Sequence, residues 1–152
     1  MDFVLNLKTI FKKMGLTYAT LKLTNQYDEY KFGEGLIPQD QIRELTVDMM
    51  VDTGSIRLAI NEEIRTKLGL KIGIPMQVSL ADGTISTKEL VGGIKVSFGN
   101  RSCYTDAFVL PGNTEPLLGA IPIEGMDLAV VPAENTLIYN PKHPDGALFS
   151  LK

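Results

Sequence analysis

Residues 52–55 form the stretch of this chain whose residue types could most directly do chemistry. An aspartate, a threonine, a glycine and a serine stand there, directly after the apolar run of residues 49–51. A carboxylate at the buried end of a strand is costly unless it is paired, hydrogen-bonded or protonated. Asp52 is therefore either a turn residue at an exposed strand end or a group whose placement serves a reaction.

The other residues that could carry chemistry predict weaker sites. His143 is the only histidine, which argues against a histidine-based metal site or a Ser-His-Asp triad within one chain. We expect His143 to be a surface loop residue. Cys103 lies in a strand-like run without a neighbouring histidine, which favours a small buried residue. The sequence contains no phosphate-binding glycine loop followed by Lys-Ser or Lys-Thr. We therefore expect neither a metal ion nor another cofactor.

The composition excludes several classes of partner. The 152 residues are 44% hydrophobic and 22% charged, which is ordinary for one globular domain. A net charge of −3 argues against a nucleic-acid surface, and no apolar run is long enough to span a bilayer. The single cysteine excludes an internal disulfide and fits a reducing compartment, so we expect a cytoplasmic location.

Residues 1–13 are expected to form an N-terminal extension, either helical or disordered. Their lysines follow the apolar residues and no small-residue cleavage site is visible, so the order differs from that of a signal peptide. Apolar residues recur at helical spacing among the lysines, as in a basic amphipathic helix on a membrane surface. The alternative is a loosely docked or frayed segment.

Most of the chain alternates apolar and polar residues between turn signals, which predicts a mostly-β domain. Residues 25–35 are polar and contain glycine, so they are expected to form a loop or an exposed hairpin. Strands are expected at residues 16–24, 42–51, 94–98, 102–110, 127–131 and 135–140.

Two segments predict helices. Residues 61–68 carry a strong signal, because Asn61 can cap the first turn and Gly69 can close the last one. Residues 121–126 can hold one further short helix. The fold is thus expected to contain one or two short helices.

Residues 76–90 predict a long hairpin between these helices. Asp82-Gly83 lies between two strand-like runs, and Asp-Gly is among the best two-residue hairpin turns. Gly92-Gly93 then marks a corner or a bulge.

Three segments, in this order, resemble the single-domain, retropepsin-like aspartic proteases. They are Val51-Asp52-Thr53-Gly54-Ser55, the hairpin around Ala81-Asp82-Gly83-Thr84, and Leu117-Leu118-Gly119-Ala120. The last segment, preceded by Glu115-Pro116 and followed by Met126-Asp127-Leu128, also resembles the small bacterial clan AA proteins.

This resemblance covers about residues 16–140 and implies a closed, orthogonal β-barrel-like fold with a flap hairpin. Residues 14–141 would form the protease domain. Residues 142–152 would be a C-terminal tail and a candidate part of the dimer interface.

The resemblance also implies a mechanism in which two aspartates share one proton around a water molecule, one acting as base and the other as acid. This chain has one Asp-Thr-Gly, so the implied enzyme is a symmetric homodimer in which the two copies of Asp52 meet on the two-fold axis. Thr53 would bond across the interface, and the Gly54 N–H would reach the carboxylate. Ser55 would donate its hydroxyl to Asp52 and favour the ionised form, which predicts an acidic optimum.

The remaining roles follow from the same resemblance. The hairpin would be a flap that closes over an extended peptide or protein substrate. Its substrate-binding residues would be Leu80, Ala81, Asp82, Gly83 and Thr84. An apolar strand would support the Asp52 loop from behind, formed by Leu117, Leu118 and Gly119. Candidates for the specificity pockets are Arg57, Leu58, Val78, Leu80 and Ile85.

Three functions stay open at this point. The first is a dimeric aspartic endopeptidase, and the second is a catalytically silent module of the same fold that binds peptides or dimerises. The third is a chance Asp-Thr-Gly turn in an unrelated β protein. The intact motif favours the enzyme, because an idle domain need not keep a costly buried carboxylate.

Overall fold

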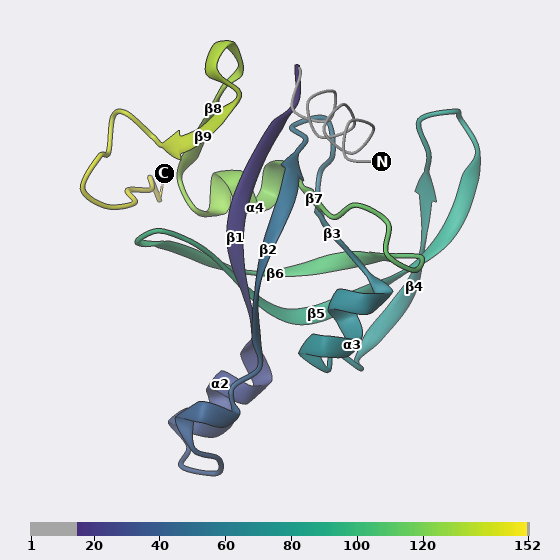
Figure 1. Cartoon of the computed structure of the whole chain (residues 1–152), viewed down its shortest axis with the longest axis vertical. Coiled ribbons are helices and arrows are strands. Elements are labelled where there is room, and N and C mark those ends of the chain that lie inside the picture. Colours follow the sequence, from purple (N-terminus) through teal and green to yellow (C-terminus); the bar gives the residue numbers. More distant parts are fainter. Residues whose placement is uncertain (1–14, 152) are drawn as a thin grey trace, which may run out of the picture.

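The computed structural model describes residues 15–151 and shows a mostly-β chain with short helices, as the sequence predicts (Figure 1). The strands of its main sheet are β1 (Thr17–Asn25), β2 (Glu44–Val51), β3 (Leu58–Asn61), β4 (Gly73–Ser79), β5 (Ile85–Phe98), β6 (Arg101–Leu110) and β7 (Leu117–Leu118). Two further strands, β8 (Leu128–Val131) and β9 (Thr136–Tyr139), form a separate small sheet. The expected extension at residues 1–13 lies outside the described residues.

The main sheet closes on itself. Its strands pair in the order β1-β2-β7-β3-β6-β5-β4, and an additional antiparallel pairing between β1 and β5 closes the ring. Among the described residues, strand β4 pairs only with β5, so it lies outside the ring as an edge strand. Strand β5 is long enough to belong to both parts, since its first half pairs with β4 and its second half crosses β1. This arrangement confirms the closed β architecture that the sequence predicts.

The ring encloses an apolar core. Leu21 and Leu23 of β1, Leu58 and Ile60 of β3, and Leu118 of β7 are all at most 1% exposed. Each such side chain contributes about 1.5–3 kcal/mol through its burial. Strands β3 and β7, which adjoin the Asp52 loop, are therefore anchored in the apolar core.

Two of the helices occur where the sequence predicts them. Helix α3 (Glu62–Leu68) begins after Asn61, whose side chain accepts a hydrogen bond from the Ile64 N–H at 2.8 Å, and it ends at Gly69 in the left-handed conformation. Helix α4 (Ala120–Gly125) follows β7 directly. Two short 3-10 turns, η1 (Gln39–Gln41) and η2 (Pro132–Glu134), are also present. None of the helices within residues 15–151 is long and apolar enough to cross a membrane.

The prediction of a loop or an exposed hairpin at residues 25–35 is wrong, because this segment forms helix α2 (Gln26–Gly33). The helix projects from the end of β1 (Figure 1). The helix begins after Asn25, whose side chain accepts a hydrogen bond from the Asp28 N–H at 3.0 Å. Arg43 then binds the buried Asp28 carboxylate through two bonds of 2.8 and 3.0 Å. Capping and this long-range ion pair, rather than an apolar stripe, stabilise the helix.

The hairpin between β4 and β5 is present, but its turn is longer than the expected two residues. The Gly83 N–H donates to the Leu80 carbonyl, and the Leu80 N–H donates to the Thr84 carbonyl. Gly83 has a φ of 85°, which completes a three-residue turn of the type that ends in a left-handed residue. Asp82 accepts hydrogen bonds from the Thr84 N–H and hydroxyl, so it stabilises the turn. The expected bulge is also present, because the β5–β6 register shifts between Val91 and Ile94.

The C-terminal tail is held against the small sheet by Asp127. The Asp127 carboxylate accepts hydrogen bonds from the Asn140 side chain and from the Leu148 N–H, and one of its oxygens lies 2.7 Å from Nδ1 of His143. His143 lies in a loop, as the sequence predicts, but it is half-buried and contacts the Asp127 carboxylate. The buried Arg101 donates to the backbone carbonyls of both Asp127 and His143.

We expect Asp127→Asn to destabilise the chain in a pH-dependent way. The hydrogen bonds from Asn140 and Leu148, together with the nearby His143 ring, lower the pKa of Asp127 to about 2. The pKa of aspartate in an unfolded chain is about 3.9. The stabilisation of the fold by the Asp127 carboxylate is therefore complete above that pH and is lost as the pH falls towards 2. Urea unfolding of both proteins should therefore show a difference in the free energy of unfolding at about pH 6 that shrinks by about pH 2.5. A difference that stays constant over this range would contradict this role of the carboxylate.

Candidate active site

Asp52 lies at the end of β2, in a loop that passes around β7 to reach β3. In the sheet, β7 lies between these two strands: it pairs in parallel with β2 and in antiparallel with β3. The Asp52 N–H donates to the Leu118 carbonyl at 2.9 Å, so the loop begins on a strand that belongs to the core. The expected apolar strand behind the Asp52 loop is thus present.

The far end of the loop is tied to the start of α4. The Ala120 N–H donates to the Ser55 carbonyl and the Ile121 N–H donates to the Ile56 carbonyl, both at 2.8 Å. These are amide groups of the first helical turn, which have no acceptor within the helix. The backbone from Asp52 to Ile56 is therefore fixed at both ends by β7 and α4.

Gly119 makes this close approach possible. A Cβ atom at this position would lie 2.7 Å from the Ser55 carbonyl oxygen and still closer to the Arg57 carbonyl oxygen. Gly119 has a φ of −95°, which any residue can adopt, so the requirement is for space and not for an unusual backbone conformation.

The Asp52 carboxylate is half-buried and accepts one hydrogen bond within the loop. Its Oδ1 receives the Gly54 N–H at 3.0 Å, as the sequence predicts. Thr53 and Gly54 are exposed in the single chain. The tip of the loop is therefore accessible to another molecule.

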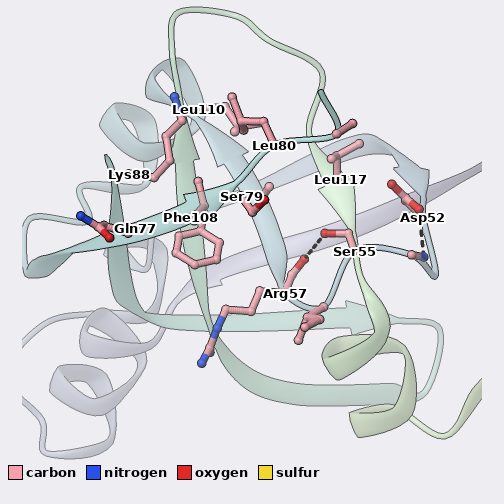
Figure 2. Close-up of a pocket in the computed structure, with 15 residues that line it drawn as sticks. Asp52, Ser55, Arg57, Gln77, Ser79, Leu80, Lys88, Phe108, Leu110 and Leu117 are labelled. Atoms are coloured by element: carbon pink, nitrogen blue, oxygen red, sulfur yellow. Dashed lines mark hydrogen bonds between the residues drawn. The ribbon is translucent and has the colours of Figure 1, made fainter. Parts of the chain in front are cut away.

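The expected hydrogen bond from Ser55 to Asp52 is absent. The Ser55 hydroxyl lies 3.4 Å from the Arg57 carbonyl oxygen instead (Figure 2). The backbone of Ser55 is bound to Ala120, and its side chain points along the chain towards Arg57. The acidic optimum expected from a Ser55 hydroxyl bond to Asp52 thus loses its physical basis.

A cleft of about 730 Å³ lies between the Asp52 loop and the β4–β5 hairpin (Figure 2). One wall contains Asp52, the loop that follows it and Leu117, and the other wall comes from β4, β5 and β6. The residues that line it are Asp52, Gly54, Ser55, Ile56, Arg57, Ala59, Gln77, Val78, Ser79, Leu80, Ala81, Lys88, Phe108, Leu110 and Leu117.

The cleft contains some of the residues predicted for substrate binding but not all of them. Of the predicted flap residues, Leu80 and Ala81 line it, whereas the tip residues Asp82, Gly83 and Thr84 do not. Of the predicted specificity residues, Arg57, Val78 and Leu80 line it. The other two predicted specificity residues are wrong, because Leu58 is fully buried in the core and Ile85 is exposed outside the cleft.

Sequence reasoning missed the far wall of the cleft. Phe108 and Leu110 alternate along β6 with Ala107 and Val109, which are buried. That alternation shows that two faces exist. It does not show that β6 lies beside β3, which is the pairing that turns Phe108 towards the cleft.

Few charged side chains line the cleft: Asp52, Arg57 and Lys88. The guanidinium of Arg57 points away from Asp52 and forms an ion pair of 2.7 Å with Asp106 (Figure 2). Asp52 is the one carboxylate among the residues that line the cleft within the described chain. No group of three or more His, Cys, Asp or Glu side chains within residues 15–151 could hold a metal ion.

The comparison with known families agrees with this geometry. A family model described as aspartyl protease matches residues 40–122, which is more than half of the chain. The chain belongs to the aspartyl protease family. The matched region includes the Asp52 loop, the β4–β5 hairpin and β7, the three elements that carry the resemblance in the sequence. A search of curated proteins found no match.

Proposed function

We propose that this aspartyl protease family member is an aspartic endopeptidase that works as a homodimer. The observation that carries the proposal is the placement of Asp52, which lies in a loop fixed by β7 and α4 and faces the cleft below the β4–β5 hairpin. Family membership supports the same chemistry. The proposed site consists of Asp52, Thr53 and Gly54 from each of two subunits, supported by Ser55 and by residues 117–119.

The number of carboxylates supports a dimer. The proposed reaction needs two aspartates that share a proton, because two like charges so close cannot both ionise. The cleft of the described chain contributes one, Asp52. A two-fold axis through the exposed tip of the loop, at Thr53 and Gly54, would supply the second carboxylate from the partner subunit.

The chemistry then follows from the two protonation states. The ionised Asp52 takes a proton from water as the water oxygen bonds to the carbonyl carbon of the peptide. The protonated Asp52 of the other subunit donates its proton to the carbonyl oxygen, which gives a tetrahedral diol. The first Asp52 then passes the proton that it took from water to the amide nitrogen, the C–N bond breaks, and the second Asp52 takes a hydroxyl proton of the diol as the acid product forms. In each subunit the Gly54 N–H holds one oxygen of the carboxylate in place.

The cleft walls suit an extended peptide. Apolar side chains of Leu80, Phe108, Leu110 and Leu117 line much of it, and they would take apolar side chains of the substrate. We propose that the β4–β5 hairpin is a flap, in which backbone groups of residues 80–84 bind the peptide as an added strand.

The tail at residues 142–152 is a candidate dimer contact beside the protease domain at residues 14–141. Within the described part of the tail, Leu148, Phe149 and Leu151 are more than half exposed. Exposed apolar side chains close together in sequence are typical of an interaction surface. Dimerisation that buries them would remove this apolar area from water.

A digest of a peptide library between about pH 4 and 7, the range expected for a shared pair of carboxylates, tests the proposal. We expect the wild-type protein to cleave peptides and Asp52→Asn to leave them intact, with both proteins dimeric in sedimentation velocity. Cleavage that survives in Asp52→Asn would contradict the assignment. A dimer that cleaves no peptide at any pH would favour the catalytically silent binding module.

A further inference from the structure

Lys88 occupies the end of the cleft remote from Asp52. It lies on β5, opposite Met76 of β4, and its side chain is half-buried in the cleft wall. In Figure 2, Lys88 and Asp52 lie on opposite sides of the cleft, with Leu80 and Phe108 between them. A peptide bound with its scissile bond at Asp52 would pass Lys88 with a more distant residue.

Lys88 differs from the other basic residues of the described chain in its lack of a partner. Within residues 15–151, the shielded arginines and lysines other than Lys88 form ion pairs: Arg57 with Asp106, Arg65 with Glu89, Lys95 with Glu29, and Arg101 with Asp127. The exposed ones, such as Lys71, are in contact with water, which hydrates their charge. Lys88 is the one basic side chain in this range that is half-buried and has neither an ion pair nor a hydrogen bond.

Lys88 lines the cleft as a half-buried residue, and within residues 15–151 its ammonium group has no counter-charge. A carboxylate that enters the cleft would restore a charged partner in a site that is partly shielded from water, where such a pair is stronger than on an open surface. Arg57, the other cation of the cleft, is already neutralised by Asp106 and offers less to a ligand.

We propose that Lys88 determines specificity by binding an acidic side chain of the peptide substrate, at a position away from the scissile bond. This inference rests on the proposed peptidase function and adds the substrate class to it. The preferred substrate is an extended peptide with apolar residues near the scissile bond, taken by Leu80, Phe108 and Leu117, and a glutamate or aspartate further along.

The test uses end-blocked peptides that the wild-type protein cleaves, in which each position in turn carries glutamate, glutamine or lysine. At about pH 6, where glutamate is ionised, we expect glutamate to be favoured roughly tenfold in kcat/KM at positions remote from the scissile bond, one on each side of it because the proposed symmetric dimer carries Lys88 twice. Lys88→Gln should abolish this preference, and Lys88→Glu should reverse it in favour of lysine. Lys71→Gln, which removes an exposed lysine outside the cleft, should leave it unchanged.

Salt provides an independent check, because a charge pair at a partly exposed site weakens as the ionic strength rises. The glutamate preference of the wild type should shrink in about 0.5 M NaCl, whereas the cleavage of the glutamine peptides should change far less. A glutamate preference that is absent, or one that survives in Lys88→Gln, would overturn the proposal.

A binding measurement tests the role of Lys88 independently of the proposed peptidase function. Fluorescence anisotropy of labelled glutamate and glutamine peptides, with Asp52→Asn and with Asp52→Asn/Lys88→Gln, needs no cleavage. If no peptide is cleaved, the proposed function fails, yet tighter binding of the glutamate peptide that depends on Lys88 still supports this inference. Equal binding of both peptides, or no binding of either, would overturn it.

Discussion

Replacing Gly119 by alanine is expected to destabilise the chain and to remove most of the proposed peptidase activity. The new Cβ would lie 2.7 Å from the Ser55 carbonyl oxygen and closer still to that of Arg57. Neither atom can move alone, because the Ser55 carbonyl accepts the Ala120 N–H and the loop is bound at both ends. Overpacking of this kind costs about 2–3 kcal/mol, which corresponds to a fall in Tm of roughly 5–10 °C.

The effect on activity has a separate cause. The loop that alanine pushes away also carries Asp52, and a shift of about 1 Å in a catalytic group can lower the rate about 10²-fold. Thermal unfolding and peptide cleavage should therefore both decline. Gly33→Ala is the matched control, because nothing lies within 4 Å of its added Cβ and its φ is not positive. A Gly119→Ala protein as stable and active as Gly33→Ala would contradict the close packing of the loop.

The second large effect is expected in Asp52→Asn, which should lower kcat at least about 10³-fold with the fold unchanged. An amide can neither take the proton of water nor share one with a second carboxylate. Asp52 is half-buried and accepts a single hydrogen bond, from the Gly54 N–H, so its replacement by asparagine should change the free energy of unfolding by less than about 1 kcal/mol.

Asp40→Asn is the control for this prediction. Asp40 lies exposed in the η1 turn, outside the cleft, and its substitution removes the same charge. Single-turnover cleavage of one good peptide and urea unfolding should be measured for both variants. Equal activity of Asp40→Asn and Asp52→Asn would place the chemistry elsewhere.

The sequence predicts most of the strands and the Asp52 loop, because their signals are local, but it does not predict β3. Alternation and turn residues mark the strands, and Asn61 and Gly69 mark the ends of α3. The order of the Asp-Thr-Gly motif, the hairpin and the Leu-Leu-Gly segment predicts which strand supports the loop, and the pairing of β7 with β2 and β3 agrees with it.

Most of the features that the sequence did not predict depend on contacts between residues distant in the chain. Helix α2 lacks an apolar stripe, and the Asp28–Arg43 ion pair that fixes it joins residues fifteen positions apart. Phe108 and Lys88 reach the cleft only because β6 pairs with β3 and β5 with β4. The Ser55 hydroxyl turns towards Arg57, a choice between two nearby acceptors that residue type does not determine.

The central claim is that each active site contains Asp52 from two subunits, and subunit mixing tests it most directly. A fixed amount of wild-type protein should be exchanged with increasing amounts of Asp52→Asn, with exchange verified by energy transfer between labelled subunits and Lys71→Gln as the control partner. If the mixed dimers are inactive, an equal amount of Asp52→Asn should lower the activity to about half and a threefold excess to about a quarter. Activity that stays constant while the subunits exchange would show that each chain works alone, and it would contradict the shared site.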